Sequence, residues 1–161
     1  MIKTEINGLK DMERALEQLA KEYGVKEGEK TLRQALRNSA KPVLNSAKEK
    51  VPQKTGKLKD SLKISVGKPN REDRKNGADS STVAVARVKA GNTKKANQGG
   101  VYYTHMVEYG TKRSAPHPFI RPAIEAESHN SRSIFANELG KAIDKSAKRL
   151  QKKANKNKGG K

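Results

Sequence analysis

Apolar residues recur at every third or fourth position over residues 9–23, with charged residues between them. This spacing lines the apolar side chains along one face of an α-helix. The pattern predicts an N-terminal amphipathic helix that ends at a hinge near Gly24. Its apolar face consists of Leu9, Met12, Leu16, Leu19 and Tyr23.

A second helical pattern covers residues 32–47 and contains a proline at position 42. Pro42 lacks the N–H group that would bond the carbonyl oxygen four residues earlier. The pattern therefore predicts either a kinked central helix or two abutting helices. The apolar stripe consists of Leu32, Leu36, Val43, Leu44 and Ala47.

Two later segments alternate apolar and polar residues, which is typical of half-buried strands. Residues 58–66 predict the first strand, and residues 82–90 predict a second strand that returns beside it. The polar stretches 68–81 and 91–100 are predicted to be long mobile loops. The apolar strand positions are Leu58, Leu62, Ile64 and Val66 in the first segment, and Val83, Val85 and Val88 in the second.

Residues 101–110, VYYTHMVEYG, hold three of the four tyrosines and predict either a short buried strand or a single helical turn. The chain then becomes rich in glycine and proline. Gly110 can take the positive φ of a tight turn, while Pro116 and Pro118 bias the residues before them toward extended backbone. Residues 107–125 are therefore predicted to form a rigid corner rather than a catalytic loop.

The rigid corner should direct Phe119 into the core beside the tyrosines. Pro122 fits the first position of a final helix, where its missing N–H costs nothing. The apolar stripe of that helix reaches Leu150. Glu108 and Arg121 bracket the corner, and we expect them to pair, either within one subunit or between subunits.

These elements predict an α+β fold: a small antiparallel sheet packed against an N-terminal helix, a kinked central helix and a C-terminal helix. The length of 161 residues suits a single domain, which we place at residues 1–150. Residues 151–161 have no apolar stripe and are predicted to form a basic, flexible C-terminal arm. Since only 32% of residues are hydrophobic and 4% aromatic, the core should be small.

The chain has 36 Lys and Arg against 17 Asp and Glu, a formal net charge of +19. Such a charge attracts polyanions or acidic protein surfaces. Basic residues near the C-terminus are candidates for contacts with phosphate or with an acidic partner, although solvation of a terminal helix explains them equally well. No aromatic residue lies among them, so sequence-specific reading of nucleic acid is not expected. The candidates are Lys148, Arg149, Lys152 and Lys153.

The sequence contains no recognisable catalytic or metal-binding motif. Cysteine is absent, and the three histidines lack the spacing of a zinc site. A nucleophile elbow, a P-loop and a dinucleotide-binding fingerprint are also missing. No apolar stretch approaches the roughly 20 residues of a membrane span. We therefore expect no enzymatic activity, no cofactor and no membrane partner.

Three stretches in a fixed order resemble the head-tail joining proteins, also called tail-completion or neck proteins, of long-tailed double-stranded DNA bacteriophages. The first is NGLKDMERALEQL, near the N-terminus. The second is AKPVLNSAKEKVPQKTGKLKDSL, in which a proline-containing helix leads to a Thr-Gly pair. The third is the tyrosine-rich run with its Glu-Tyr-Gly-Thr turn and its Pro-Phe-Ile-Arg-Pro-Ala corner. The similarity covers roughly residues 6–150.

The resemblance implies a structural virion protein at the head-tail interface, present in the host cytoplasm during assembly. It implies a homo-oligomeric ring that contacts other neck and tail proteins, with non-specific contact with phage DNA left open. The alternative is a basic nucleic-acid-binding protein without sequence specificity. No catalytic residue carries over. The matching positions, expected to shape the fold or an interface, are Thr55, Gly56, Leu58, Glu108, Gly110, Thr111, Pro118, Phe119, Arg121 and Pro122.

Overall fold

A computed structural model of the chain describes residues 9–52, 56–90 and 101–158, which divide into two compact units. Each unit brings together segments that are far apart in the sequence. The expectation of one domain over residues 1–150 stays a prediction, because a division by contacts does not test independent folding. Unit 1 combines Met1–Ser39, Val66–Val85 and Ser133–Lys161, and unit 2 combines Ala40–Ser65 and Ala86–Arg132.

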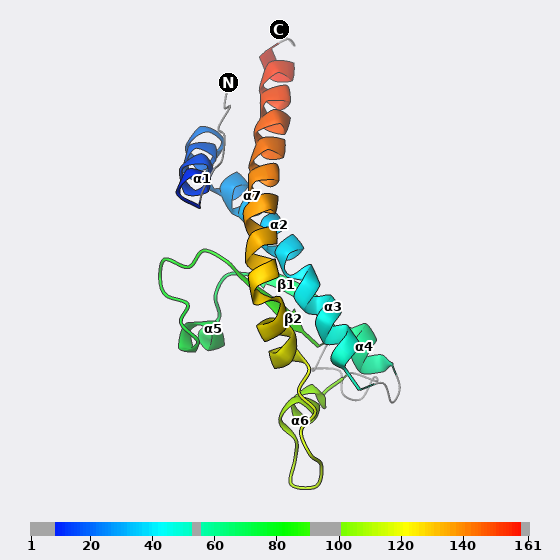
Figure 1. Ribbon diagram of the computed structural model, residues 1–161. Helices are drawn as coiled ribbons and strands as arrows, with labels where there is room; N and C mark the ends of the chain where they lie inside the picture. Colours follow the sequence, from blue (N-terminus) through cyan, green and yellow to red (C-terminus); the bar gives the residue numbers. More distant parts are fainter. Residues whose placement is uncertain (1–8, 53–55, 91–100, 159–161) are drawn as a thin grey trace. The chain divides into compact units, whose positions relative to one another are not determined.

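Unit 1 is built around α1 (Leu9–Tyr23), α2 (Val25–Ser39) and the C-terminal part of α7 (Ile120–Lys158) (Figure 1). The first helix has the predicted bounds, and it ends at Gly24, whose φ of +94° favours glycine. The apolar faces of the three helices form one core, as the amphipathic pattern requires. That core contains Met12, Ala15, Ala35, Leu139 and Ile143.

Polar side chains tie α2 to α7 at three levels along unit 1. Residue numbers rise along one helix as they fall along the other, so the two helices run in opposite directions. Each contact joins a polar residue of α2 to a polar residue of α7. The contacts are Asn38 Nδ2 donating to Glu138 at 2.6 Å, the hydroxyls of Thr31 and Ser146 at 2.9 Å, and Arg149 donating to Glu27.

Unit 2 contains α3 (Lys41–Lys50), α4 (Lys57–Ser61), α6 (Thr104–Tyr109) and the start of α7. The ambiguous run at 101–110 is therefore helical. These elements share a second hydrophobic core, separate in its residues from that of unit 1. It contains Val43, Ala47, Val51, Leu58, Leu62, Val101, Phe119 and Ala123.

The central helical pattern forms two abutting helices, one of the two predicted alternatives. The second helix ends at Ser39, and the third begins at Lys41. Pro42 lies in the first turn of α3, where its missing N–H breaks no hydrogen bond within the helix. The proline therefore marks a helix start rather than a kink inside one helix.

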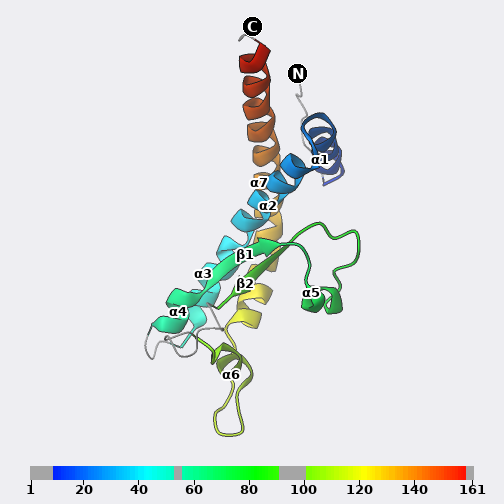
Figure 2. The ribbon, with the colours of Figure 1, turned by 180° about the vertical axis from the view of Figure 1, so that it is seen from behind.

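The sheet has two antiparallel strands, β1 (Lys63–Gly67) and β2 (Val85–Lys89), seen side by side in Figure 2. The fold is α+β, as predicted, but the predicted strand bounds were wrong. Leu58 lies in α4 rather than in a strand, because its four-residue spacing from Leu62 also fits one helical turn. Val83 lies outside β2 and is 47% exposed.

The segment 68–81 contains ordered structure where a mobile loop was expected. Its helix α5 (Arg71–Lys75) begins with a capping box between Asn70 and Asp73. The N–H of Asp73 donates to Asn70 Oδ1 at 2.8 Å, and the N–H of Asn70 donates to Asp73 Oδ2 at 2.7 Å. Two backbone donors at the helix start are thereby satisfied. The other expected loop, 91–100, lies outside the described residues.

A compact turn at Asp79 follows α5. The hydroxyl groups of Ser81 and Thr82 donate to Asp79 Oδ1 at 2.6 and 3.0 Å. These hydrogen bonds, that of Ser81 first, hold the pKa of the Asp79 carboxyl below its ordinary value. Thr82, the first residue of the predicted second strand, belongs to this turn, and β2 starts at Val85.

Helix α7 continues to Lys158, so residues 151–158 are helical rather than frayed. The stretch has a high density of lysine and no apolar stripe. That residues 151–161 form an arm that the fold does not need stays a prediction.

Candidate functional site

Glu108 closes the N-terminus of α7 from the neighbouring helix α6. Its side chain is buried, and its Oε2 accepts hydrogen bonds from the N–H groups of Phe119 at 2.9 Å and Ile120 at 3.1 Å. Its Oε1 accepts from the N–H of Arg121 at 3.1 Å. The next residue, Pro122, has no N–H. All four N–H groups that a helix start leaves without a partner are thus accounted for.

This cap explains the observed start of α7. The helix begins at Ile120, two positions before the predicted Pro122. A carboxylate at this end also interacts favourably with the helix macrodipole, which carries partial positive charge at the N-terminus. The buried Glu108 therefore has a structural partner for each of its oxygens.

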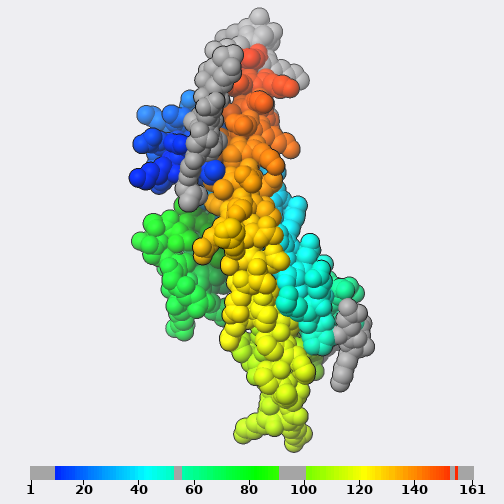
Figure 3. All heavy atoms as spheres, viewed as in Figure 1, coloured from blue at the N-terminus to red at the C-terminus, as the bar shows by residue number. Residues whose placement is uncertain are grey.

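The corner loop, residues 110–118, connects α6 to α7. It turns back on itself, since the N–H of Thr111 donates to the carbonyl of Ser114 at 2.9 Å. The N–H of His117 donates to the carbonyl of Val107 at 2.8 Å, and this hydrogen bond holds the returning part of the loop against α6. Residues 111–118 are all exposed, and the yellow-green atoms of this region project from unit 2 in Figure 3.

Gly110 begins the corner loop in a backbone conformation that is unfavourable for any residue with a Cβ atom. Its φ is +75° and its ψ is −178°, a region that is essentially restricted to glycine. A Cβ atom at this position would lie 2.9 Å from Pro116 N and 2.9 Å from Ser114 O. Glycine is therefore required here both by conformation and by space.

Phe119 anchors the corner loop in the core of unit 2. Its side chain is fully buried, as predicted. Tyr103 and Val107 are partly buried against the same cluster, so one of the three tyrosines of this segment packs against the core that contains the phenylalanine. The corner is thus fixed at both ends, by the Glu108 cap and by Phe119.

A hollow of about 380 Å³ lies beside the corner, between α6 and the first turns of α7. We call it the α6–α7 hollow. Tyr109 and Ile124 on its lining are 70% and 50% exposed. Tyr102 and Met106 are also exposed in unit 2. The hollow is lined by Thr104, Glu108, Tyr109, Ile120, Arg121, Ile124 and Glu125.

The expected pairing of Glu108 with Arg121 takes a different form within this chain. The contact uses the backbone N–H of Arg121 and not its guanidinium. The Arg121 side chain is exposed, and among the described residues it forms no ion pair. Both Glu108 oxygens already accept backbone hydrogen bonds, so a side-chain pair across a subunit interface, which stays a prediction, would have to compete with them.

The remaining family-motif residues lie in different places. Gly56 precedes α4 with a φ of +70°, and Leu58 is buried in the core of unit 2. Thr111 and Pro118 are exposed on the corner loop. Thr55 lies outside the described residues. These positions come from two separate segments of unit 2, and their interface roles stay predictions.

The basic candidates near the C-terminus lie on α7. Lys148 and Lys152 are exposed along a shallow basic face of the helix. Arg149 is instead engaged, because its guanidinium bonds to Glu27 of α2. Lys153 belongs to α7, but its side chain is outside the described part of the structure. Of the three candidates whose side chains the structure describes, Arg149 has a partner within the chain.

Within residues 9–52, 56–90 and 101–158, no three histidine, cysteine or carboxylate side chains gather as a metal site would need. The helices described over these ranges also lack the combination of length and apolarity that crossing a bilayer requires.

Two features of the surface were not singled out from the sequence. The first is the exposure of Tyr109 and Ile124, which depends on how α6 and α7 meet. The second is a row of basic residues on α2, whose regular spacing of four, three and four was visible in the sequence. That row consists of Lys26, Lys30, Arg33 and Arg37.

A family model described as "Bacteriophage HK97-gp10, putative tail-component" matches residues 10–110 of the chain. The match covers more than half of the 161 residues and extends through α6 to Gly110, the first residue of the corner loop. No curated protein and no solved structure matches the chain. The family agrees with the resemblance to head-tail joining proteins. The chain belongs to the HK97-gp10-like family of bacteriophage tail components.

Proposed function

We propose that this tail component completes the tail at the head-tail interface and that it acts by assembling into a ring. Its role is structural and involves no catalysis and no cofactor. The observation that carries the proposal is the exposed apolar surface around the α6–α7 hollow, next to the projecting corner loop.

The exposed side chains at the hollow favour contact with another protein surface. Tyr109 is 70% exposed and Ile124 is 50% exposed. Burying one large apolar side chain against a partner contributes about 1.5–3 kcal/mol. Apolar patches with a polar rim are typical of interaction sites. Arg121 and Glu125 line the same hollow and supply charges of both signs at its rim.

The corner loop supports assembly because it is already ordered before any contact forms. The prolines of the loop restrict its conformations, Gly110 permits the positive φ that the turn adopts, and Phe119 holds the end of the loop in the core. A preorganised segment loses little conformational entropy on binding. A head-to-tail contact between one surface and a different surface on the next copy closes into a ring when the rotation between copies allows it.

In this proposal the protein resides in the virion, with assembly in the host cytoplasm. Its partners are further copies of itself and the neighbouring neck and tail proteins. The exposed lysines Lys148 and Lys152 face either DNA or an acidic neighbour. Family membership favours this role over that of a free nucleic-acid-binding protein.

The test replaces the apolar side chains at the hollow by serine. Tyr109→Ser combined with Ile124→Ser should abolish ring formation, measured by native mass spectrometry and electron microscopy, and should leave the melting temperature close to that of the parent. A second readout is the fraction of tails lacking this protein that join to heads after the purified protein is added.

A matched control removes exposed apolar surface from unit 1 instead. Val25→Ser combined with Val83→Ser, at side chains that are 67% and 47% exposed, should leave assembly and joining intact. Normal rings from the Tyr109/Ile124 variant would exclude the hollow as the contact. A parent protein that neither assembles nor restores joining would contradict the proposed function itself.

A further inference from the structure

Four basic side chains follow one face of α2 at successive helical turns. They occupy positions 26, 30, 33 and 37, with spacings of four, three and four residues. Residues at these spacings lie on the same face of a helix. At 1.5 Å per residue the row extends for about 16 Å along the helix axis. The row is therefore a linear array of positive charge.

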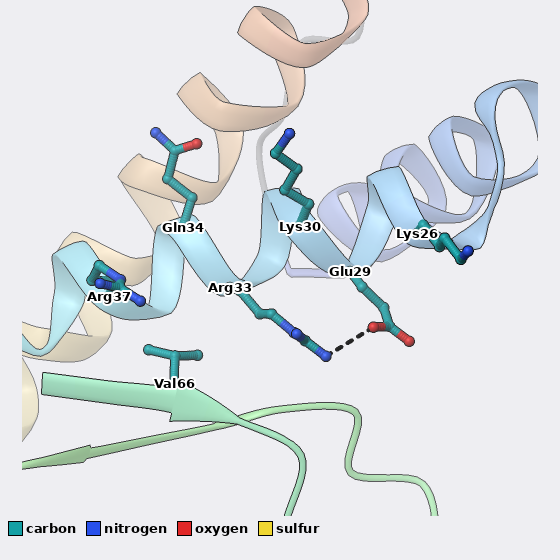
Figure 4. A pocket seen from close by; sticks show the side chains of 7 residues that line it. All are labelled: Lys26, Glu29, Lys30, Arg33, Gln34, Arg37 and Val66. Carbon is teal, nitrogen blue, oxygen red and sulfur yellow. Dashed lines mark hydrogen bonds and ion pairs between the residues drawn. The ribbon is translucent and has the colours of Figure 1, made fainter.

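The four side chains line a groove of about 470 Å³ along α2. In Figure 4, Arg33 extends on the side of α2 that faces β1, whereas Lys30 extends from the opposite edge of the helix. Val66 on β1 points toward the helix and forms the far side of the groove. We call this site the α2 basic groove. Its lining consists of Lys26, Glu29, Lys30, Arg33, Gln34, Arg37 and Val66, all of them in unit 1.

Most of the positive charge in the α2 basic groove is uncompensated. Glu29 is the one acidic residue of the lining, and it accepts a hydrogen bond from Arg33 at 2.9 Å. The other three cations are exposed, and over the described residues none of them has a hydrogen-bond or ion-pair partner. They are Lys26, Lys30 and Arg37. Like charges one turn apart repel each other, so an anion bound in the groove would relieve that repulsion.

We propose that the α2 basic groove binds the phosphate groups of a nucleic-acid backbone. Phosphates recur along a strand, so a linear row of cations can contact several of them in succession. The lysines act as point charges, while the guanidinium of Arg37 can donate two parallel hydrogen bonds to one phosphate. Arg33 is paired with Glu29, so the net positive charge of the row comes from Lys26, Lys30 and Arg37.

The residues that line the groove favour nucleic acid over an acidic protein as its binding partner. Protein partners gain most of their affinity from a few apolar, aromatic or arginine anchors in desolvated pockets. Val66 is the single apolar side chain lining this groove, Arg33 is paired with Glu29, and Arg37 is exposed, so the lining lacks a desolvated anchor. A phosphate backbone requires only the cations. No aromatic side chain lines the groove, so bases cannot stack there, and binding should be independent of sequence.

This site differs from the surfaces used in the proposed assembly. The α2 basic groove belongs to unit 1, whereas the α6–α7 hollow and the corner loop belong to unit 2. It also differs from the C-terminal lysines, which lie on α7. The groove can therefore be altered without changing the side chains proposed to form the ring contact.

The test compares two variants of the full chain that lose the same charge. Lys30→Gln with Arg37→Gln removes two groove cations, while Lys10→Gln with Lys21→Gln removes two exposed cations from α1 in the same unit. Affinity for a labelled random-sequence DNA duplex is measured by fluorescence anisotropy across a potassium chloride series. Circular dichroism verifies that each variant is folded.

Each phosphate contact contributes about −0.9 to the slope of log affinity against log salt concentration. The groove variant should therefore bind more weakly and show a slope about 1.8 smaller in magnitude than that of the parent. The α1 control should keep the parent slope. Together these two results support the groove as a phosphate site.

Three outcomes would overturn the proposal. Equal loss of slope in both variants would show that only the overall charge matters. An unchanged slope in the groove variant, together with a reduced slope in Lys148→Gln with Lys152→Gln, would assign the phosphate contacts to α7. Retained DNA binding with lost binding of polyglutamate in the groove variant would show that the groove takes an acidic protein.

Discussion

At the scale of single residues, the Glu108 carboxylate accepts three hydrogen bonds from backbone N–H groups at the start of α7. Glutamine keeps one acceptor oxygen but replaces the other by an NH₂ group that only donates. We expect Glu108→Gln to lower the free energy of unfolding by about 1–3 kcal/mol, and Glu108→Ala by about 2–4 kcal/mol, because buried N–H groups lose their acceptors. Urea titration of each variant measures these losses.

Glu125 provides the control for that measurement. It is an exposed glutamate on α7, the helix that Glu108 caps, and among the described residues its carboxylate has no hydrogen bond. Glu125→Gln should change the free energy of unfolding by less than about 0.5 kcal/mol. If Glu108→Gln lowers the free energy of unfolding by no more than Glu125→Gln does, the cap does not stabilise α7.

Gly110 and Gly77 allow the cost of positive-φ backbone strain to be separated from the cost of steric overlap by a new Cβ atom. Both have positive φ, +75° and +102°, but only at Gly110 would a new Cβ meet backbone atoms within 4 Å. Gly77→Ala should cost about 1 kcal/mol from backbone strain alone. Gly110→Ala should cost about 1–3 kcal/mol more, because it adds steric overlap that the corner loop must move to relieve.

Chemical denaturation of the two alanine variants gives the difference directly. Equal losses in both would show that the corner loop relaxes at no cost and is therefore not rigid. The result bears on assembly too, since a loop that yields easily would not arrive preorganised at a neighbour.

At the scale of elements, the C-terminal end of α7 is expected to carry positive charge while contributing little to the free energy of unfolding. Removing residues 151–161 deletes part of the helix but almost no apolar surface, so the free energy of unfolding should change by less than about 0.5 kcal/mol. The truncated chain keeps Arg149 and its contact with Glu27. A loss of about 3–5 kcal/mol, as for truncation in a core, would show instead that this segment is packed.

How well each element could be predicted depended on whether its cause is local. The spacing of α1 is set by its own residues, and Gly24 ends it, so its bounds were predictable. Helix α4 was missed because a spacing of four, as between Leu58 and Leu62, fits alternation and a helical turn equally. The capping box at Asn70 was readable from an Asn and an Asp three residues apart.

In the candidate site too, features with a local cause could be predicted and features that depend on tertiary contacts could not. The corner could be predicted because prolines restrict the backbone wherever they occur, while Gly110 permits the positive φ of a turn. The Glu108 cap could not, since it requires α6 to bring a carboxylate to the start of another helix. The exposure of Tyr109 likewise follows from tertiary packing and has no signature in the sequence.

At the scale of the whole molecule, the two units have cores that share no residue. Phe119→Ala opens a cavity in unit 2, and Leu139→Ala opens one in unit 1. Each should lower stability by about 2–5 kcal/mol. We expect hydrogen exchange of backbone amides to accelerate mainly in α3, α4 and α6 for the first variant, and mainly in α1 and α2 for the second.

Mass spectrometry of the exchanged peptides resolves these helices. If each variant accelerates exchange equally in all of them, the chain unfolds as one cooperative unit despite its two cores. That outcome would support the single domain expected over residues 1–150.

The Glu108 cap has a consequence for the order in which the chain folds. Its hydrogen bonds join residues 11–13 positions apart, whereas the polar contacts between α2 and α7 join residues 100–122 positions apart. Closing a short loop costs less entropy than closing a long one, and local contacts form faster. We therefore expect the corner to form early and the α2–α7 pairing late. Changes at Glu108 should slow folding, while changes at the Thr31–Ser146 contact should chiefly speed unfolding.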